Sequence, residues 1–371
     1  MYLNTRMEKP IVADRDIPCF VYIRRYNHVE EEKKHGINWL IHRAVHKCDP
    51  TGIVYTKFYE PYRNVEMKPG TTIASKSDRV YSGKYNGMNH YRVEDGFVHG
   101  MLRADNYGTA FPYKATIPQG CEFYVNNGLF RIASRKMVVS KEKVSTLPPL
   151  QETLRPILPL LIEEIFGSKN KLSPGFYYLN NGSYLNPKDL SMDLVGDVCG
   201  IVSGIDGDAV TVMSLDEVEM VWCKLESQTR ICSDSDIDAS GEDIMLNIMR
   251  SEHYGDAFLP ARWCSKYETG GGLRGSWHLG SIGEVSTAIC DNMLEINVAI
   301  SVLNNEFEII TNQSGRFEML DSLSYYWTGV DCEDYYAYTV DGCDGRLSKA
   351  HKKTSELKVR AFMQKIKPFT L

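Results

Sequence analysis

The sequence has no excess of basic residues and no long apolar run. Its 42 Lys and Arg against 48 Asp and Glu give a formal net charge of −6, whereas a nucleic-acid-binding domain usually carries a basic patch. We therefore expect no nucleic acid among its partners. A helix that spans a bilayer needs about 20 predominantly apolar residues. No uncharged stretch approaches that length, so we expect no membrane insertion.

The N-terminal segment also lacks an apolar core. Its first 18 residues carry the charged side chains Arg6, Glu8, Lys9, Asp14, Arg15 and Asp16. A secretory signal peptide needs an apolar region of roughly 7–15 residues. We therefore expect no signal peptide and synthesis in a cytoplasm.

The usual zinc-binding motifs are missing as well. The ten cysteines are irregularly placed, and neither Cys-x-x-Cys nor His-Glu-x-x-His occurs. Zinc sites usually depend on such pairs. We expect most cysteines to be reduced, buried, small apolar residues. The prediction is that the chain holds no metal and no cofactor.

Two clusters of potential metal ligands fail closer tests. The acidic run at 234–243 has Ala239 where an EF-hand loop needs glycine and Met245 where it needs glutamate. The second cluster consists of His28, His35, His42 and His46. It includes an i, i+4 pair but has no carboxylate motif beside it. We expect both segments to be solvated loops or surfaces.

At 371 residues the chain is long enough for two domains. Residues 1–144 are expected to form an N-terminal β-rich attachment domain. Strands are predicted at 16–23 and 132–139, and a strand–turn–strand at 114–124, whose turn is indicated by Pro118 and Gly120.

Residues 145–172 are rich in leucine and proline. Apolar residues at coiled-coil spacing are Leu147, Leu150, Leu154, Ile157 and Leu161. Pro148, Pro149, Pro156 and Pro159 argue against one straight helix. The segment is either a linker whose leucines pack on a neighbouring domain or a kinked helix that joins subunits about an axis.

Residues 173–371 are expected to form a second domain with both strands and helices. A hairpin is predicted over 174–184, a second over 198–215, and helices over 243–249 and 258–267. Ser281 and Glu284 form a capping box. The helix that they begin is expected to run on through Ile289, Met293, Ile296 and Ile300.

Three aromatic motifs follow one another in this second domain: Gly-Ser-Trp-His-Leu-Gly-Ser-Ile-Gly-Glu at 275–284, Tyr-Tyr-Trp-Thr at 325–328 and Lys-Val-Arg-Ala-Phe at 358–362. They resemble the Trp-x-Leu-Pro-Ser-x-x-Glu, Tyr-Trp-Ser-Ser and Val-Arg-Pro-Val blocks of surface domains with a C-type-lectin-like fold, which are common in Bacteroidetes and their phages. Gly280 replaces the proline of that pattern, and Thr328-Gly329 replaces its Ser-Ser.

The N-terminal half carries a second resemblance. Asp-Ile-Pro-Cys-Phe at 16–20, Gly-Phe-Val-His at 96–99 and Ile-Pro-Gln-Gly at 117–120 look like a small domain near the N-termini of Bacteroidetes phage proteins. Together the resemblances imply an α+β chain with an N-terminal β-rich domain and a C-terminal C-type-lectin-like domain. They also imply that Trp277 and Trp327 lie in the core, and Glu284 and Arg360 sit in matching positions where we expect a buried ion pair.

The segment 329–351 is rich in Tyr, Asp, Cys, Ser and His. Tyrosine offers a large contact area at a low entropic cost, as in antibody loops. In related domains this region can be diversified by a retroelement, and the composition resembles that outcome. The segment is either an ordinary polar hairpin or a ligand-contact surface above buried Trp327 and Arg360. The predicted ligand-contact residues are Tyr335, Tyr336, Tyr338, Asp341, Asp344, Arg346 and His351.

The resemblance implies a non-enzymatic virion protein of a Bacteroidetes phage, including the crAss-like phages. It would be a head or tail fibre or decoration protein, a homotrimer that contacts other virion proteins and binds a host-surface glycan or protein. Two alternatives stay open. One is an enzyme of the related formylglycine-generating fold, for which Cys332 and Cys343 are the only candidate reactive pair. The other is a bacterial cell-surface adhesin.

Overall fold

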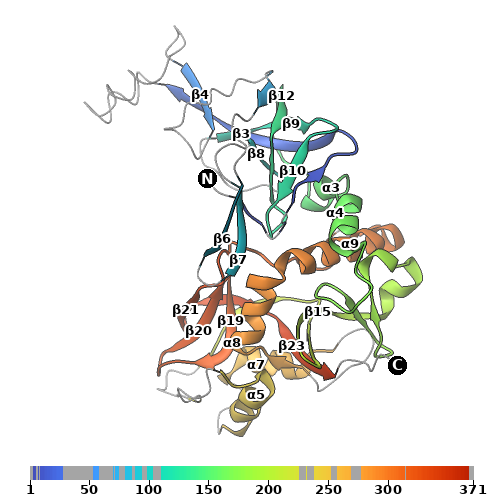
Figure 1. Ribbon diagram of the computed structural model, residues 1–371. Coiled ribbons are helices and arrows are strands. Elements are labelled where there is room, and N and C mark those ends of the chain that lie inside the picture. The colour runs from blue at the N-terminus through green and yellow to red at the C-terminus, as the bar shows by residue number, and fades with distance from the viewer. Residues whose placement is uncertain are drawn as a thin grey trace. The chain divides into compact units, whose positions relative to one another are not determined.

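The chain is α+β, as predicted, and its described residues form four sheets whose strand pairs are antiparallel with one exception. The computed structural model (Figure 1) describes residues 3–5, 7, 9–27, 53–57, 70, 72–74, 80–85, 88–93, 98–102, 110–224, 231, 238–251, 257–268, 277–313 and 315–366. Two units are present: Met1–Tyr85 with Asn89–Ile157, and Asn86–Met88 with Leu158–Leu371. The main boundary falls inside the segment 145–172.

The N-terminal unit is built from strands. They are β1 (Leu3–Thr5), β2 (Ile11–Val12), β3 (Ile17–Asn27), β4 (Ile53–Lys57), β5 (Thr72–Ala74), β6 (Val80–Tyr85), β7 (Met88–Val93), β8 (Val98–Met101), β9 (Ala110–Ile117), β10 (Glu122–Val125), β11 (Arg131–Ser134) and β12 (Lys136–Lys143). One sheet has the order β1-β7-β6, and the other β2-β10-β11-β8-β3-β9-β12-β5, with β4 beside β3. The β-rich character expected of this half is confirmed.

The turn at Pro118–Gly120 is present, but the strands around it differ from the prediction in detail. Gly120 has a φ of +80°, a conformation that glycine adopts without strain. The prediction of a single strand at 132–139 is wrong, because the strand is interrupted between β11 and β12. There Arg135 forms an ion pair with Glu122 at 2.7 Å. The break lets β11 pair with β10 and β8, while β12 pairs with β9 and β5.

The segment 145–172 forms two short helices, α3 (Leu150–Leu154) and α4 (Leu158–Phe166). Pro156 lies between them, where its missing N–H group does not interrupt a helix. Leu154, Ile157 and Leu161 are 0% exposed within the single chain. Their apolar spacing is therefore explained by packing inside the chain. These side chains are not accessible to another subunit.

The C-terminal unit combines two sheets with helices. Its strands are β13 (Tyr177–Leu179), β14 (Tyr184–Leu185), β15 (Val198–Asp206), β16 (Ala209–Met213), β17 (Val218–Val221), β18 (His278–Leu279), β19 (Tyr325–Asp331), β20 (Tyr336–Asp341), β21 (Leu347–His351), β22 (Glu356–Val359) and β23 (Ala361–Ile366). The sheet orders are β14-β13-β15-β16-β23-β18 and β17-β22-β19-β20-β21. Besides α4, its α-helices include α5 (Gly241–Arg250), α7 (Leu259–Lys266), α8 (Ile282–Ser286) and α9 (Met293–Thr311). Both predicted hairpins and the two predicted helices at α5 and α7 are confirmed.

The capping box of Ser281 and Glu284 is confirmed, but the long helix that it was expected to begin is bent. A π-helical turn (Thr287–Asp291) follows α8, and Asn292 leaves the helical conformation before α9 begins. The Asn292 side chain donates a hydrogen bond to the carbonyl of Ser203 at 2.8 Å, which holds the break in place. The predicted apolar stripe is nevertheless buried along its whole length.

The core of this unit lies between α8–α9 and the sheet strands. Tyr177, Ile201, Met213, Tyr326 and Phe362 belong to one buried cluster with the apolar faces of these helices. Within the described residues no single helix is long and apolar enough to cross a membrane. The bent pair Ile282–Asp291 and Met293–Thr311 reaches that length and composition only as two segments at 77°, and much of its apolar surface faces this core.

Candidate functional site

The hairpin of β20 and β21 carries most of the predicted contact residues. Tyr336 lies opposite His351, and Tyr338 lies opposite Lys349. Because side chains alternate between the two faces of a strand, these four residues share one face. Asp341 is an odd number of residues from Tyr336 and belongs to the other face. In the described part of the chain, β21 is the last strand of its sheet.

Tyr335, Tyr336 and His351 form what we call the aromatic cluster. The Tyr335 ring stacks on the imidazole at 6.1 Å and 17°, and the Tyr336 ring meets it edge-on at 5.7 Å and 78°. Tyr335 is 44% exposed and Tyr336 is 38% exposed. Two large rings are therefore held in a fixed arrangement at the surface.

A charged pair extends the same face. The ammonium of Lys349 lies 5.9 Å from the centre of the half-buried Tyr338 ring, within reach of a cation–π interaction. It also forms an ion pair with Glu333 at 2.7 Å. The hydrogen bond to Glu333 raises the pKa of Lys349. Polar donors and acceptors thus stand beside the aromatic cluster.

A buried ion pair supports the loop that carries Tyr335. Lys352 donates to Asp331 at 2.7 Å, and both side chains are nearly inaccessible to solvent. The Lys352 ammonium also donates to the carbonyl of Asp334 at 3.2 Å and lies 5.1 Å from the Trp222 ring centre. Its backbone N–H donates to the carbonyl of Tyr335 at 2.9 Å. The loop between β19 and β20 is therefore tied to the end of β21.

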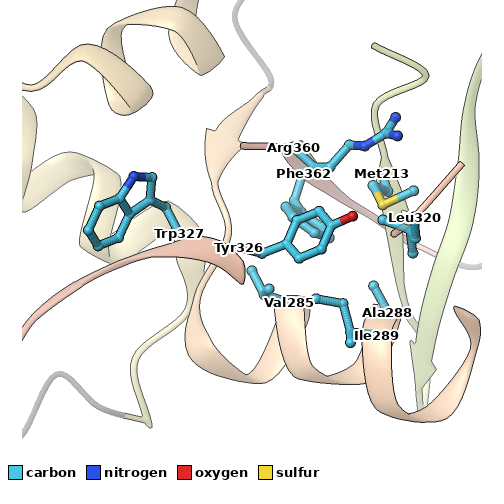
Figure 2. A pocket seen from close by; sticks show the side chains of 9 residues that line it. All are labelled: Met213, Val285, Ala288, Ile289, Leu320, Tyr326, Trp327, Arg360 and Phe362. Carbon is cyan, nitrogen blue, oxygen red and sulfur yellow. The ribbon is translucent and has the colours of Figure 1, made fainter. Parts of the chain in front are cut away.

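The burial predicted beneath this face is confirmed for Trp327 and Arg360, which are 1% and 3% exposed. The indole N–H of Trp327 donates to the carbonyl of Met220 at 2.9 Å, and that of Trp222 donates to Thr328 at 2.9 Å. Both tryptophans fix β19 to its surroundings. Figure 2 shows Tyr326 and Trp327 on opposite sides of β19.

The remaining predicted residues lie at the other end of β20. Asp341 accepts a hydrogen bond from the N–H of Cys343 at 2.8 Å, and Asp344 accepts one from the N–H of Arg346 at 3.0 Å. The five residue steps from Tyr336 to Asp341 span about 17 Å in a strand. The structure thus separates Asp341, Asp344 and Arg346 from the aromatic cluster. The expectation that Tyr338, Asp341 and Asp344 are exposed is wrong, because all three are half-buried.

Cys332 and Cys343 do not lie close enough to form a reactive pair in this structure. They flank the two ends of β20, a separation of about 20 Å, whereas two cysteines that react with each other need Cα atoms within about 7 Å. Cys332 is buried and Cys343 is exposed. Burial raises the pKa of the Cys332 thiol. Six of the eight described cysteines are buried, as predicted for most of them.

The described residues contain no group of three His, Cys, Asp or Glu side chains that could hold a metal ion. His28, His35, His42 and His46 lie outside the described residues, as do residues 234–237 of the acidic run. The part of that run that is described, from Asp238 onward, leads into α5.

The expected ion pair of Glu284 and Arg360 is wrong. Arg360 pairs with Glu217 at 2.9 Å, and Lys358 joins the same carboxylate at 2.5 Å. Val218 pairs with Val359, a register that places Glu217 beside Arg360. Glu284 instead accepts hydrogen bonds from the N–H of Ser281 at 2.8 Å and from His278 at 2.9 Å.

A cavity in the core beneath β19 has a volume of about 10 Å³. Figure 2 shows its lining, which consists of Met213, Val285, Ala288, Ile289, Leu320, Tyr326, Trp327, Arg360 and Phe362. This is the space of about one water molecule. The cavity is a packing defect within the core, and the surface of the β20–β21 hairpin is the better candidate for a binding site.

No family model matches the chain. No curated protein matches it either. Its structure has a distant similarity to the crystal structure of a fimbrial protein from Bacteroides ovatus, with a TM-score of 0.39 and 14% sequence identity. That similarity covers 52% of this chain and 48% of the fimbrial protein, so the chain spans about half the length of that protein.

Sequence reasoning missed Glu333, Lys349 and Lys352 as parts of this surface and its support. Lys349 and His351 are two residues apart, which is the spacing of neighbours on one face of a strand. Gly342 and Gly345 indicate a turn before them. Those two signals together predict the β20–β21 hairpin. The partner of Lys352 follows only from the three-dimensional arrangement.

Proposed function

We propose that the chain is a non-enzymatic binding protein whose C-terminal unit recognises its ligand through the aromatic cluster. The observation that carries the proposal is the fixed exposure of Tyr335 and Tyr336 around His351. Exposed aromatic groups are a cost in water unless a partner covers them. Tyrosine is also enriched among the residues that dominate binding energy.

The three aromatic motifs support a more specific proposal. The C-terminal unit is a C-type-lectin-like domain, and the whole chain is a virion protein of a Bacteroidetes phage, in a head or tail fibre or in a capsid decoration. Its ligand is a glycan or protein on the host surface. Its other partners are virion proteins, and the assembled form is a homotrimer. The distance between Cys332 and Cys343 speaks against the enzyme alternative.

The proposal is tested with the labelled full-length chain on a panel of intact Bacteroidetes strains and on a glycan array. We expect the double substitution Tyr335→Ala and Tyr336→Ala to weaken binding about 30-fold or more, equivalent to about 2 kcal/mol. The melting temperature should stay nearly unchanged, because both rings are exposed.

Tyr325→Ala is the matched control, since Tyr325 is a 42% exposed tyrosine of the same sheet at the far end of β19. It should bind as the wild-type chain does. Loss of binding in the control together with full binding by the double variant would place the ligand elsewhere.

A further inference from the structure

The imidazole of His351 connects three segments around the aromatic cluster. It contacts Tyr335 in the loop before β20 and Tyr336 at the start of β20. Its Nδ1 atom accepts a hydrogen bond from the backbone N–H of Lys353 at 3.2 Å, in the turn after β21. The carbonyl of His351 accepts a second bond from the N–H of Ser355 at 3.1 Å. One side chain thus sets the geometry of both tyrosines and of the turn.

The bond from Lys353 assigns the acceptor role on this imidazole to Nδ1. A backbone N–H can only donate, so Nδ1 must carry a lone pair and the ring proton resides on Nε2. Uptake of a second proton would occur at Nδ1. Two N–H groups would then face each other, and the hydrogen bond could not persist. Either the ring turns or the 351–355 turn opens, and both movements release the hydrogen bond that holds the imidazole between Tyr335 and the turn.

The charged groups around His351 do not compensate for that loss. Lys349 shares its face of β21, and the charge of Lys349 is paired with Glu333. Lys352 is on the other face and is paired with Asp331, and the Asp334 carbonyl is occupied by Lys352. The rings of Tyr335 and Tyr336 attract a cation, but weakly at an exposed position. In the described part of the chain no carboxylate is bonded to this imidazole.

We infer that His351 is the positioning residue of the binding surface and that it holds Tyr335 and Tyr336 in their binding arrangement only while its Nδ1 is unprotonated. Binding should therefore weaken when Nδ1 takes up a proton. The expected effect on binding rests on the proposed function. The structural change around His351 does not depend on it.

The first test needs no ligand. NMR spectra of the full chain follow the ring nitrogens of His351, the ring protons of Tyr335 and the amide exchange of Lys353 between pH 8 and pH 5. In the wild-type chain we expect the Lys353 amide to lose protection as the imidazole gains its proton. In His351→Asn the side-chain oxygen replaces Nδ1 as acceptor and cannot titrate, so protection should not change with pH. A Lys353 amide that stays protected beside a protonated His351 would overturn the inference.

The second test measures binding to a strain that the panel identifies. Wild-type binding should be about tenfold or more weaker at pH 5 than at pH 8, and His351→Asn should bind with no pH dependence in that range. His351→Ala should bind weakly at every pH. Equal pH dependence in the wild-type and His351→Asn chains would contradict the switch. If the double tyrosine variant binds normally at pH 8, the proposed function fails, and the NMR test alone still decides the role of His351.

Discussion

At the scale of single residues, Glu284 shows how a charge is accommodated in the interior of the C-terminal unit. Its carboxylate accepts hydrogen bonds from Ser281, His278 and Gln364. Gly241 leaves the space that this carboxylate fills, because a Cβ atom at that position would lie 2.3 Å from Oε2. Burial raises the pKa of Glu284, but the bonds from His278 and Ser281 outweigh it, and the pKa lies below its ordinary value.

We therefore expect Glu284 to stabilise the fold at neutral pH. Its pKa in the folded chain is lower than in the unfolded chain, so its contribution is fully present above the unfolded value of about 4.3 and is lost as pH falls through the folded value. Glu284→Gln should lower the free energy of unfolding at pH 7 by about 1–3 kcal/mol and flatten its decline in acid. Urea unfolding between pH 3 and pH 7 measures both effects. The exposed Glu356→Gln is the control, and an identical acid response in the two variants would be evidence against this role.

The same residue shows which part of a site can be read from sequence. The spacing of Ser281 and Glu284 predicts their capping box because both residues belong to one helix turn. The partner of Arg360 could not be predicted in this way. It depends on the register of β17 against β22, which brings Glu217 beside Arg360 from 143 residues away in the chain.

At the scale of elements, α3 and α4 show that the same apolar spacing is compatible with packing between subunits and with packing inside one chain. The leucine spacing of 145–172 is compatible with a subunit seam, but Leu154 and Leu161 are fully buried in the single chain. A homotrimer that leaves this packing intact would have to associate through other residues. The bend between α8 and α9 has a similar cause, since the apolar period continues past Asn292 and does not reveal that the helix axis turns there.

Replacing both leucines with aspartate should therefore disrupt the fold rather than give folded monomers. Each substitution would bury an unpaired charge, and we expect the double variant Leu154→Asp, Leu161→Asp to lose more than about 4 kcal/mol of stability. Circular dichroism melting curves and light scattering measure the outcome. Glu164→Ala on the exposed side of α4 should melt as the wild-type chain does. A double variant that stays folded and turns from oligomer to monomer would instead support the subunit seam.

At the scale of the whole molecule, the strand and helix patterns and the family resemblances predicted an α+β chain with a β-rich first half, and the structure confirms that level of description. The strand order of the sheets could not be predicted, because β16 pairs with β23 although about 150 residues separate them in the chain. The composition of 329–351 and the family resemblance singled out the three residues of the aromatic cluster among seven predicted contact residues. That this cluster lies apart from Asp341, Asp344 and Arg346 could be seen only from the pairing of β20 with β21.

The C-terminal unit without Asn86–Met88 should fold and bind as an isolated fragment, Leu158–Leu371. In the described part of the chain, its two sheets contain no strand of the N-terminal unit, and its buried cluster extends from Tyr177 to Phe362. The pairing of β16 with β23 joins the early and late parts of the fragment, and the hydroxyl of Tyr177 donates to the carbonyl of Ala299 at 2.7 Å. One continuous buried core favours a cooperative unfolding transition. We expect the fragment to show such a transition in urea and to retain the affinity and the pH dependence of the full chain.

A matched fragment of residues 1–157 should not bind the same cells. A C-terminal fragment that unfolds without cooperativity would contradict independent folding. A 1–157 fragment that binds would show that the binding surface is not contained in the unit that carries the aromatic cluster.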